Sequence, residues 1–236
     1  MKAFLICFSG IDGSGKTTLC KKVVGELESR NIRSRYAYGR FLPIAVAPFF
    51  KVISLLALRR WNQQDQHRYS SESKKRLLSN PILFRLFLIA ILFDQSLRIL
   101  LKVWLPSILR KKVTICDRYL LDTVIVDIAL SCGLSNKETT RILQRCSKIF
   151  PQADLVFIVD VPPKIAFQRK NDLYSIEILE HLSNMYLWVG KEIGATIIDG
   201  TKNLSEIKHF VLCKLRSIGI QPNLTTLNSR EGDQQK

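Results

Sequence analysis

The chain has 236 residues, of which 47% are hydrophobic and 24% are charged; this composition is typical of a globular protein and excludes a wholly disordered, collagen-like or heptad-repeat chain. Its length suits one α/β domain with a substantial core. Lys and Arg outnumber Asp and Glu by 36 to 20, and almost the whole surplus lies in residues 1–118. Such a positive field attracts nucleic acid, an anionic membrane surface or phosphorylated small molecules, so charge alone does not choose among these partners.

Five short β-forming runs alternate with longer stretches of helical periodicity. The predicted strands are residues 3–9, 33–38, 113–116, 155–161 and 195–198, and the predicted helices are residues 17–30, 137–147, 164–170, 175–189 and 204–217. This alternation indicates a parallel sheet covered by helices on both faces. We therefore predict an α/β three-layer sandwich with about five strands, formed by a single domain over residues 1–217. The polar, aperiodic residues 218–236 are expected to be a disordered tail.

Two segments are unusually apolar. Residues 41–58 carry one charge in 18 positions, and residues 82–93 carry one charge in 12. Neither suits a membrane span, because two prolines and a lysine interrupt the first, and the second is shorter than the roughly 20 apolar residues that a spanning helix needs. We interpret both as helices buried in the core. Because residues 41–112 are also strongly basic, contact with anionic lipid or a dimer interface stays open as an alternative.

The cysteines do not form a recognisable framework. Six are present, and no two have the Cys-x-x-Cys spacing. The first residues lead directly into a glycine-rich motif rather than to a small-residue cleavage site. We therefore expect free thiols and a reducing, cytoplasmic location.

A phosphate-binding loop follows the first predicted strand. Residues 10–17 (GIDGSGKT) match G-x-x-x-x-G-K-[ST] and lead into a predicted helix, which is the context that this motif requires. Glycines without Cβ let backbone N–H groups curl around phosphate oxygens, while Lys16 reaches the β and γ phosphates and Thr17 gives a hydroxyl to Mg²⁺. The predicted ATP-binding residues are Gly10, Ile11, Asp12, Gly13, Ser14, Gly15, Lys16, Thr17 and Thr18.

A second motif, VTICDRY, ends the third predicted strand. Ligands of open parallel sheets bind outside the carboxyl ends of the strands, so Asp117 is the expected magnesium-associated or water-positioning carboxylate. Arg118 can make a bidentate contact to a second phosphate. The predicted metal residues are thus Thr17 and Asp117, and the predicted catalytic residues include Lys16, Asp117 and Arg118.

These motifs resemble those of the thymidylate kinase family of nucleoside monophosphate kinases. FSGIDGSGKTTL is similar to the family's opening loop, residues 117–119 (Asp-Arg-Tyr) match its acceptor-site motif, and the order of elements agrees from about residue 1 to 217. The resemblance implies a P-loop kinase that transfers a phosphoryl group from ATP·Mg²⁺ to a nucleoside monophosphate, first of all dTMP, and it suggests a homodimer. It places Asp12 near the acceptor's sugar hydroxyl and Arg40, beside Arg118 and Tyr119, at the acceptor phosphate.

The same resemblance identifies a pocket helix and a lid. The helix over residues 82–101 lines the acceptor pocket in the family, where an aromatic residue and an arginine contact thymine; Ile91 and Gln95 occupy those positions here. Residues 162–185 correspond to the lid, whose basic groups are Arg169, predicted to be catalytic, and Lys170. Residues 197–207 resemble the family's final strand and the turn beside the adenine.

Two other functions remain as alternatives. One is a P-loop kinase of a phosphorylated acceptor that is not a nucleotide, located near a membrane, which the departures in the pocket helix and the basic, apolar residues 41–112 favour. The other is a nucleotide-dependent binding module without an acceptor. Nucleic-acid binding is disfavoured, because the sequence shows no nucleic-acid module and few aromatic residues between its basic residues.

Overall fold

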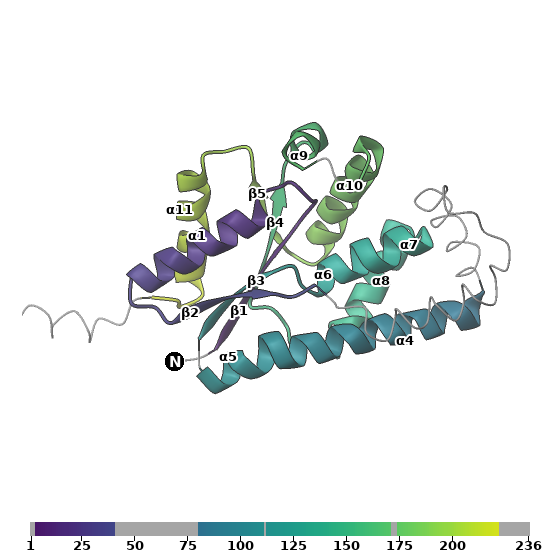
Figure 1. Cartoon of the computed structure of the whole chain (residues 1–236), viewed down its shortest axis with the longest axis horizontal. Helices are drawn as coiled ribbons and strands as arrows, with labels where there is room; N and C mark the ends of the chain where they lie inside the picture. The colour runs from purple at the N-terminus through teal and green to yellow at the C-terminus, as the bar shows by residue number, and fades with distance from the viewer. Residues whose placement is uncertain (1–2, 41–79, 111, 171–173, 222–236) are drawn as a thin grey trace, which may run out of the picture.

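The computed structural model describes residues 3–40, 80–110, 112–170 and 174–221. Within these residues, one parallel sheet of five strands has the order β2-β3-β1-β4-β5. The strands are β1 (Phe4–Ser9), β2 (Ser34–Tyr38), β3 (Val113–Asp117), β4 (Leu155–Asp160) and β5 (Thr196–Asp199). Each lies within two residues of a predicted strand, so the predicted α/β sandwich is confirmed (Figure 1).

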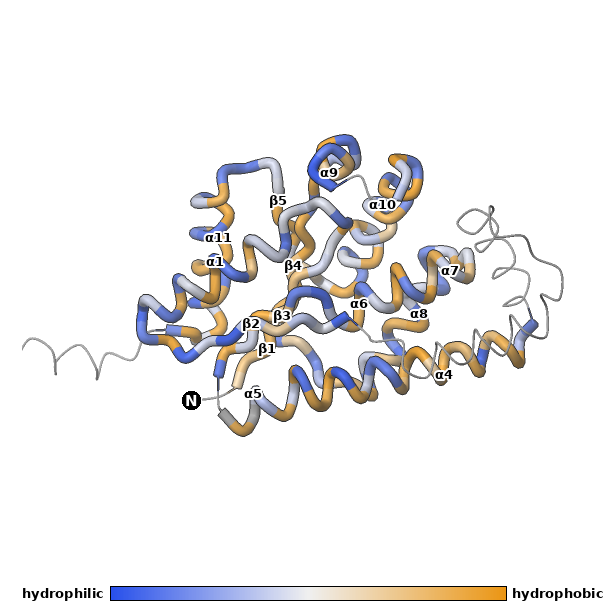
Figure 2. Tube along the Cα trace, in the orientation of Figure 1, coloured by the Kyte–Doolittle hydropathy of each residue, from blue (hydrophilic) through white to orange (hydrophobic). Residues whose placement is uncertain are grey.

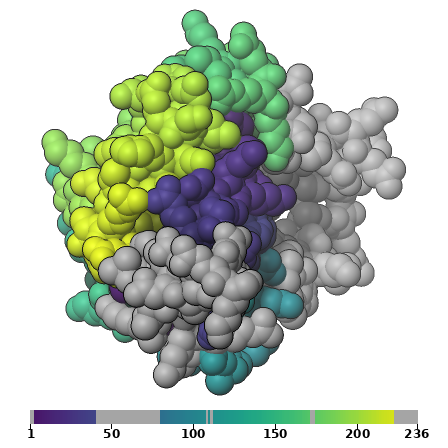
Figure 3. All heavy atoms as spheres, turned by 90° about the vertical axis from the view of Figure 1, so that its left-hand side faces the viewer, coloured from purple at the N-terminus to yellow at the C-terminus, as the bar shows by residue number. Residues whose placement is uncertain are grey.

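Helices cover both faces of the sheet (Figure 1). Helices α1 (Lys16–Ser29) and α11 (Leu204–Ser217) pack side by side on one face, where Figure 3 shows α11 in yellow next to α1 in purple. The other face carries α6 (Leu120–Asp122), the π-helical η3 (Thr123–Ala129), α7 (Leu130–Cys132), α8 (Asn136–Cys146) and α10 (Ile176–Glu192). Helix α9 (Pro163–Arg169) follows the end of β4. The central strand β1 is therefore buried along nearly its whole length, which explains its continuous apolar sequence.

Strand register aligns the carboxyl ends of three strands. Asp117, the last residue of β3, lies opposite Phe8 of β1 and Tyr38 of β2. The segments that follow these strands begin with Gly10, Arg118 and Gly39, so they meet at one edge of the sheet. This edge is where open α/β sheets bind ligands.

A long helix beside β2 is made of α4 (Pro81–Arg98), the π-helical η2 (Ile99–Trp104) and α5 (Leu105–Arg110) (Figure 1). Side chains of α4 fix it to the end of β2, because Gln95 Nε2 donates to the Gly39 carbonyl at 2.9 Å and Arg98 Nε donates to the Tyr38 carbonyl at 3.1 Å. These bonds position the pocket-side face of α4 against the sheet edge.

The outer face of this helix is apolar and exposed (Figure 2). The interpretation of residues 82–93 as a buried helix is correct for Phe87 and Ile91, which are 1% exposed, but wrong for Ile82 and Phe93, which are 67% and 59% exposed. The apolar residues of this stretch are spread around more of the helix than the sheet can cover. The exposed stripe, Ile82, Leu86, Ile89, Phe93, Leu100 and Trp104, is called the α4 stripe below.

The predictions for residues 41–58 and for most of the tail lie outside the described residues. Among the helices that the structure describes, none combines the length and hydropathy needed to cross a membrane.

Candidate functional site

The glycine-rich loop joins β1 to α1 and lies against α9. Gly13 and Gly15 have left-handed backbones, with φ of +83° and +88°. A Cβ at Gly13 would collide with the carbonyl oxygen of Ala166 in α9. Residue 13 must therefore be glycine, because a side chain would fit neither its backbone conformation nor the space beside α9. The loop and α9 are in direct contact.

Lys16, the first residue of α1, is buried within the loop that precedes it. Its side-chain ammonium donates to the Ile11 carbonyl at 2.5 Å and to Ser14 Oγ at 3.1 Å, which are both neutral oxygens. Burial, followed by the charge of Arg118, lowers the pKa of Lys16 to about 8. A desolvated ammonium at a helix N-terminus is favourably placed for a polyanion, which would supply the negative charge that neutral oxygens lack.

Asp117 lies at the centre of the sheet edge and is fully buried. Its Oδ2 accepts hydrogen bonds from Thr17 Oγ1 at 2.5 Å and from the Tyr36 hydroxyl at 3.0 Å. Its Oδ1 is buried and has no hydrogen-bond partner among the described residues. A carboxylate oxygen without a partner, next to a threonine hydroxyl, fits Mg²⁺, which binds oxygen ligands and takes few of them from the protein when phosphates supply the rest.

Arg118 is held between two carboxylates. Its backbone is left-handed, with φ of +67°, which is rare for a residue with a side chain. Its Nη2 donates to Asp12 of the loop, and its Nη1 donates to Asp122 of α6 at 3.1 Å. Burial lowers the pKa of Arg118, but the negative charges of Asp122 and Asp12 outweigh this effect and raise it overall.

A second arginine of this edge, Arg40, is paired in the same manner. Its Nη2 donates to Asp127 Oδ1 of η3 at 3.0 Å. Burial raises the pKa of Asp127 to about 6, although the charge of Arg40 opposes this shift. Burial also raises the pKa of Tyr174, and Arg40 again opposes the rise, which shows that the phenol lies close to the guanidinium.

Comparisons with known proteins agree with this geometry. No family model matches the chain. The probable thymidylate kinase 1 of Saccharolobus solfataricus is 27% identical over 209 residues, which cover 86% of this chain and 92% of that protein. The probable thymidylate kinase of Sulfurisphaera tokodaii and the thymidylate kinase of Fervidobacterium nodosum are both 26% identical, and the matches cover 86% of this chain and 90% and 93% of those proteins. The chain is thus similar to thymidylate kinases over most of its length.

The structure brings most of the predicted site residues together at one edge of the sheet. Thr17 and Asp117 are joined by a direct hydrogen bond, Lys16 precedes Thr17 at the start of α1, and Arg118 follows Asp117 and contacts the loop through Asp12. Tyr119 points away from the loop, and its hydroxyl donates to the Pro151 carbonyl at 2.8 Å.

The α4 positions predicted from the family's pocket helix are both buried. Ile91 is 1% exposed, and Gln95 is fully buried. The Gly39 carbonyl can only accept a hydrogen bond, so Gln95 must direct its Nε2 at it. Gln95 Oε1 is buried and has no hydrogen-bond partner among the described residues.

The predicted lid cations lie at the end of α9, where Arg169 and Lys170 are exposed. Arg169 is the last residue of α9 and follows Ala166, whose backbone contacts Gly13 of the loop, by three positions, whereas Lys170 comes after the helix in an extended conformation. Their role as lid residues stays a proposal.

The sequence analysis did not find three residues that pair at this site. They are the carboxylates Asp122 and Asp127, which bind Arg118 and Arg40, and Tyr186, which donates to Asp122. Asp127 could have been noticed, because it is the one charged residue in the apolar run TVIVDIAL. Asp122 follows Arg118 by four residues, a spacing that allows an ion pair when the segment is helical. Tyr186 had no local signal, because it meets Asp122 across 64 positions of sequence.

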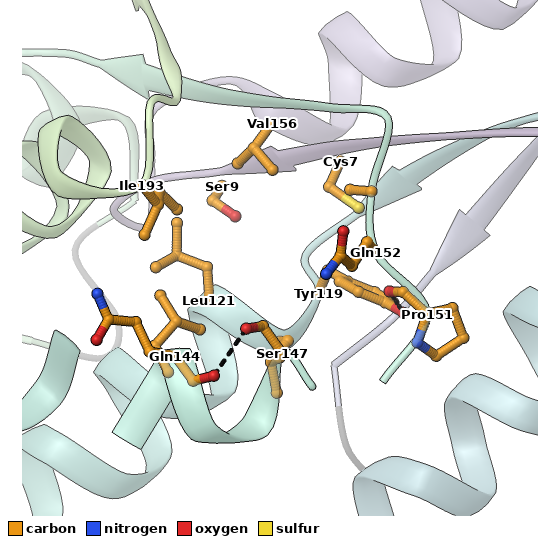
Figure 4. Close-up of a pocket in the computed structure, with 13 residues that line it drawn as sticks. Cys7, Ser9, Tyr119, Leu121, Gln144, Ser147, Pro151, Gln152, Val156 and Ile193 are labelled. Carbon is orange, nitrogen blue, oxygen red and sulfur yellow. Dashed lines mark hydrogen bonds between the residues drawn. The ribbon is translucent and has the colours of Figure 1, made fainter. Parts of the chain in front are cut away.

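A cavity of about 250 Å³ lies behind the Asp-Arg-Tyr segment, between the sheet and α8 (Figure 4). Tyr119, Leu121, Gln144 and Ile193 are among the residues that line it, and no residue of the glycine-rich loop does. This cavity is therefore separate from the phosphate site.

Proposed function

We propose that the chain transfers the γ-phosphoryl group of ATP to a nucleoside monophosphate, with dTMP as the acceptor and dTDP as the product. The observation that carries the proposal is the presence of two cation sites at one sheet edge, Lys16 within the loop and Arg118 beside it. A nucleotide switch or a simple ATPase needs the first site only. The names of the curated relatives support thymidylate as the acceptor.

The loop and Lys16 serve the donor. An oxygen of the acceptor phosphate attacks the γ-phosphorus, and the bond from that phosphorus to the β–γ bridging oxygen breaks, so that ADP leaves with the bonding electrons. Negative charge spreads over the transferred oxygens in the transition state, and Lys16 with the loop amides neutralises it. Thr17 and Asp117 would hold Mg²⁺, which supplies further neutralisation of the β and γ phosphates when bound.

The two arginines serve the acceptor. Arg118 and Arg40 bind its phosphate by exchanging a carboxylate partner for phosphate oxygens, which keeps each guanidinium paired throughout. Asp12, once released by Arg118, is free to accept a hydrogen bond from the sugar hydroxyl. Closure of α9 then brings Arg169 over the site and excludes water, which would otherwise compete as the acceptor.

Gln95 reads the base. Its fixed Oε1 is a hydrogen-bond acceptor, and the imide N–H of thymine is a donor with carbonyl groups on both sides. A reversed amide would present Nε2 instead, but the Gly39 carbonyl prevents this reversal. Ile91, one helical turn earlier, supplies an apolar surface in place of an aromatic ring.

The test is the rate of ADP release from ATP·Mg²⁺ with dTMP, dUMP, UMP, CMP, AMP or GMP, against a control without acceptor. We expect dTMP to give the largest stimulation. In Gln95→Leu, a variant of similar size without the amide, the preference for dTMP over CMP should fall. Equal rates with and without every nucleotide would reject the proposed function.

One observation favours a second candidate, a phosphorylated acceptor located near a membrane. The α4 stripe is exposed, and a groove of about 430 Å³ lies beside it, lined in part by Phe93, Leu100 and Trp104. The acidic residue of the described stretch 80–110, Asp94, is buried, whereas Arg85, next to Leu86 of the stripe, is exposed, so the charge at this surface suits anionic lipid. Sedimentation with phosphatidylserine vesicles, compared with phosphatidylcholine vesicles, tests this candidate; no binding to either would reject it.

A further inference from the structure

We propose that Asp122 is a positioning residue for Arg118 and that it couples this arginine, through Tyr186, to helix α10, whose N-terminal part lies in the predicted lid. The proposal rests on the proposed function, in which Arg118 binds the acceptor phosphate. It assigns a role to a carboxylate that belongs to neither of the two sequence motifs.

Asp122 is a buried carboxylate with both oxygens occupied. Only 1% of the residue is exposed. Its Oδ1 accepts hydrogen bonds from Arg118 Nη1 at 3.1 Å and from the Tyr186 hydroxyl at 2.8 Å. Its Oδ2 accepts from Ser9 Oγ at 2.6 Å and from the Tyr119 backbone N–H at 3.3 Å. A buried charge with this many donors is fixed in orientation, because any rotation would leave a buried donor without a partner.

The two carboxylates beside Arg118 are not equivalent. The side chain of Asp12 is 13% exposed and belongs to the loop, whereas the side chain of Asp122 is 1% exposed. An incoming phosphate can reach and replace Asp12, but it cannot reach Asp122. Asp122 is therefore the partner that Arg118 keeps, and it determines where the guanidinium points when the acceptor binds.

The same carboxylate connects three elements. Ser9 is the last residue of β1, immediately before the phosphate loop. Tyr186 lies on the buried face of α10, directly after the last residue of the predicted lid. Burial, together with the charge of Asp122, raises the pKa of Tyr186, so its hydroxyl stays protonated and donates to the carboxylate. A shift of α10 during lid closure would move this hydroxyl and, through Asp122, the guanidinium of Arg118.

The experiment compares Asp122→Asn and Tyr186→Phe with a matched control, Asp160→Asn. The Asp122→Asn change keeps the shape of the side chain but loses the ion pair with Arg118, while Tyr186→Phe removes one hydrogen bond and leaves that pair intact. Asp160 accepts a hydrogen bond from Ser183 of the same helix α10, so the control tests the effect of losing a carboxylate beside α10 in general.

Steady-state kinetics with dTMP and ATP give the first result. We expect Asp122→Asn to raise the KM for dTMP by about tenfold to a hundredfold, the range for loss of a charged hydrogen-bond partner, with less than about a threefold change in the KM for ATP. Tyr186→Phe should raise the KM for dTMP by about threefold, and Asp160→Asn should leave it unchanged. A folded Asp122→Asn protein with the wild-type KM for dTMP would overturn the proposal, and so would equal increases in both KM values.

A second readout does not depend on turnover. The ¹⁵N–¹H resonance of Arg118 Nε, assigned by its loss in Arg118→Lys, should be sharp in the wild type and broadened by water exchange in Asp122→Asn. If the wild type does not phosphorylate dTMP but this change is seen, the proposed function fails while the positioning role stands. An unchanged resonance would reject the positioning role. If Asp122→Asn does not fold, the KM for dTMP and the Arg118 Nε resonance of Tyr186→Phe still test the coupling to α10.

Discussion

The proposed donor and acceptor sides of this site neutralise their cations differently. On the donor side, the ammonium of Lys16 faces two neutral oxygens, and its pKa is lowered to about 8. On the acceptor side, Arg118 and Arg40 already face carboxylates, and their pKa values are raised. Lys16 thus has no directly bonded carboxylate among the described residues, although the charges of Asp122, Asp12 and Asp117 oppose the fall of its pKa, whereas each arginine is bonded to a carboxylate.

This difference indicates how each substrate gains its binding energy. Lys16 is in no ion pair among the described residues, so the proposed binding of a triphosphate does not require an existing ion pair to break. An acceptor phosphate must displace a carboxylate, so its net gain is the difference between two ion pairs. Donor binding should therefore depend on Lys16 itself, and acceptor binding should depend on the carboxylates as well as on the arginines.

The largest effect is expected on the donor side. Lys16→Ala should reduce kcat/KM for ATP by about a thousandfold or more, because the side chain stabilises charge that develops in the transition state. Lys22→Ala, which removes an exposed lysine from the same helix, is the matched control and should be close to wild type. Wild-type turnover in a folded Lys16→Ala protein would contradict the role of Lys16 on the proposed donor side.

The next effect concerns the acceptor arginine. Arg118→Ala should abolish detectable transfer to dTMP while ATP binding, measured by calorimetry, changes by less than about threefold. Loss of ATP binding in this variant, with the fold intact by circular dichroism, would show that Arg118 belongs to the donor side.

The ion pair of Arg40 gives a pH-dependent prediction. The pKa of Asp127 is about 6 in the folded protein, against about 3.9 for an unfolded chain, so between these values the folded state binds the extra proton. The wild type should therefore lose stability, relative to Asp127→Asn, as the pH rises from about 4 to about 7, by at most about 3 kcal/mol. Urea unfolding of both proteins at the two pH values measures this change. A wild type that gains stability over that range, relative to the variant, would contradict the assigned shift.

The smallest effect is expected at the lid. Arg169 is exposed, so Arg169→Ala should lower kcat by about tenfold or less and raise the ratio of ATP hydrolysis to transfer. Lys148→Ala, at another exposed position, is the control. An unchanged ratio of hydrolysis to transfer would remove Arg169 from the site.

The sequence predicted the sheet well because β1, β3 and β4 are short apolar runs and most strands end next to a residue with a clear signal. Examples are Gly10 after β1, Gly39 after β2 and the Pro162-Pro163 pair after β4. The donor loop was predicted for the same reason, since its function depends on residues that are adjacent in sequence.

The acceptor side could not be predicted to the same extent. Its arginines were found, but their carboxylate partners come from η3 and α6 and are selected by how those helices pack on the sheet. The α4 stripe shows a related limit. Periodicity indicates which residues are apolar, and it does not indicate how much of a helix the sheet will cover.

The most direct test of the central claim is to follow the γ-phosphoryl group itself. ATP labelled with ³²P at the γ position is incubated with Mg²⁺, dTMP and the wild-type protein, and the products are separated by chromatography. The account predicts that the label appears in dTDP and that little is released as inorganic phosphate. Label in inorganic phosphate alone, at the same rate with and without dTMP, would contradict it.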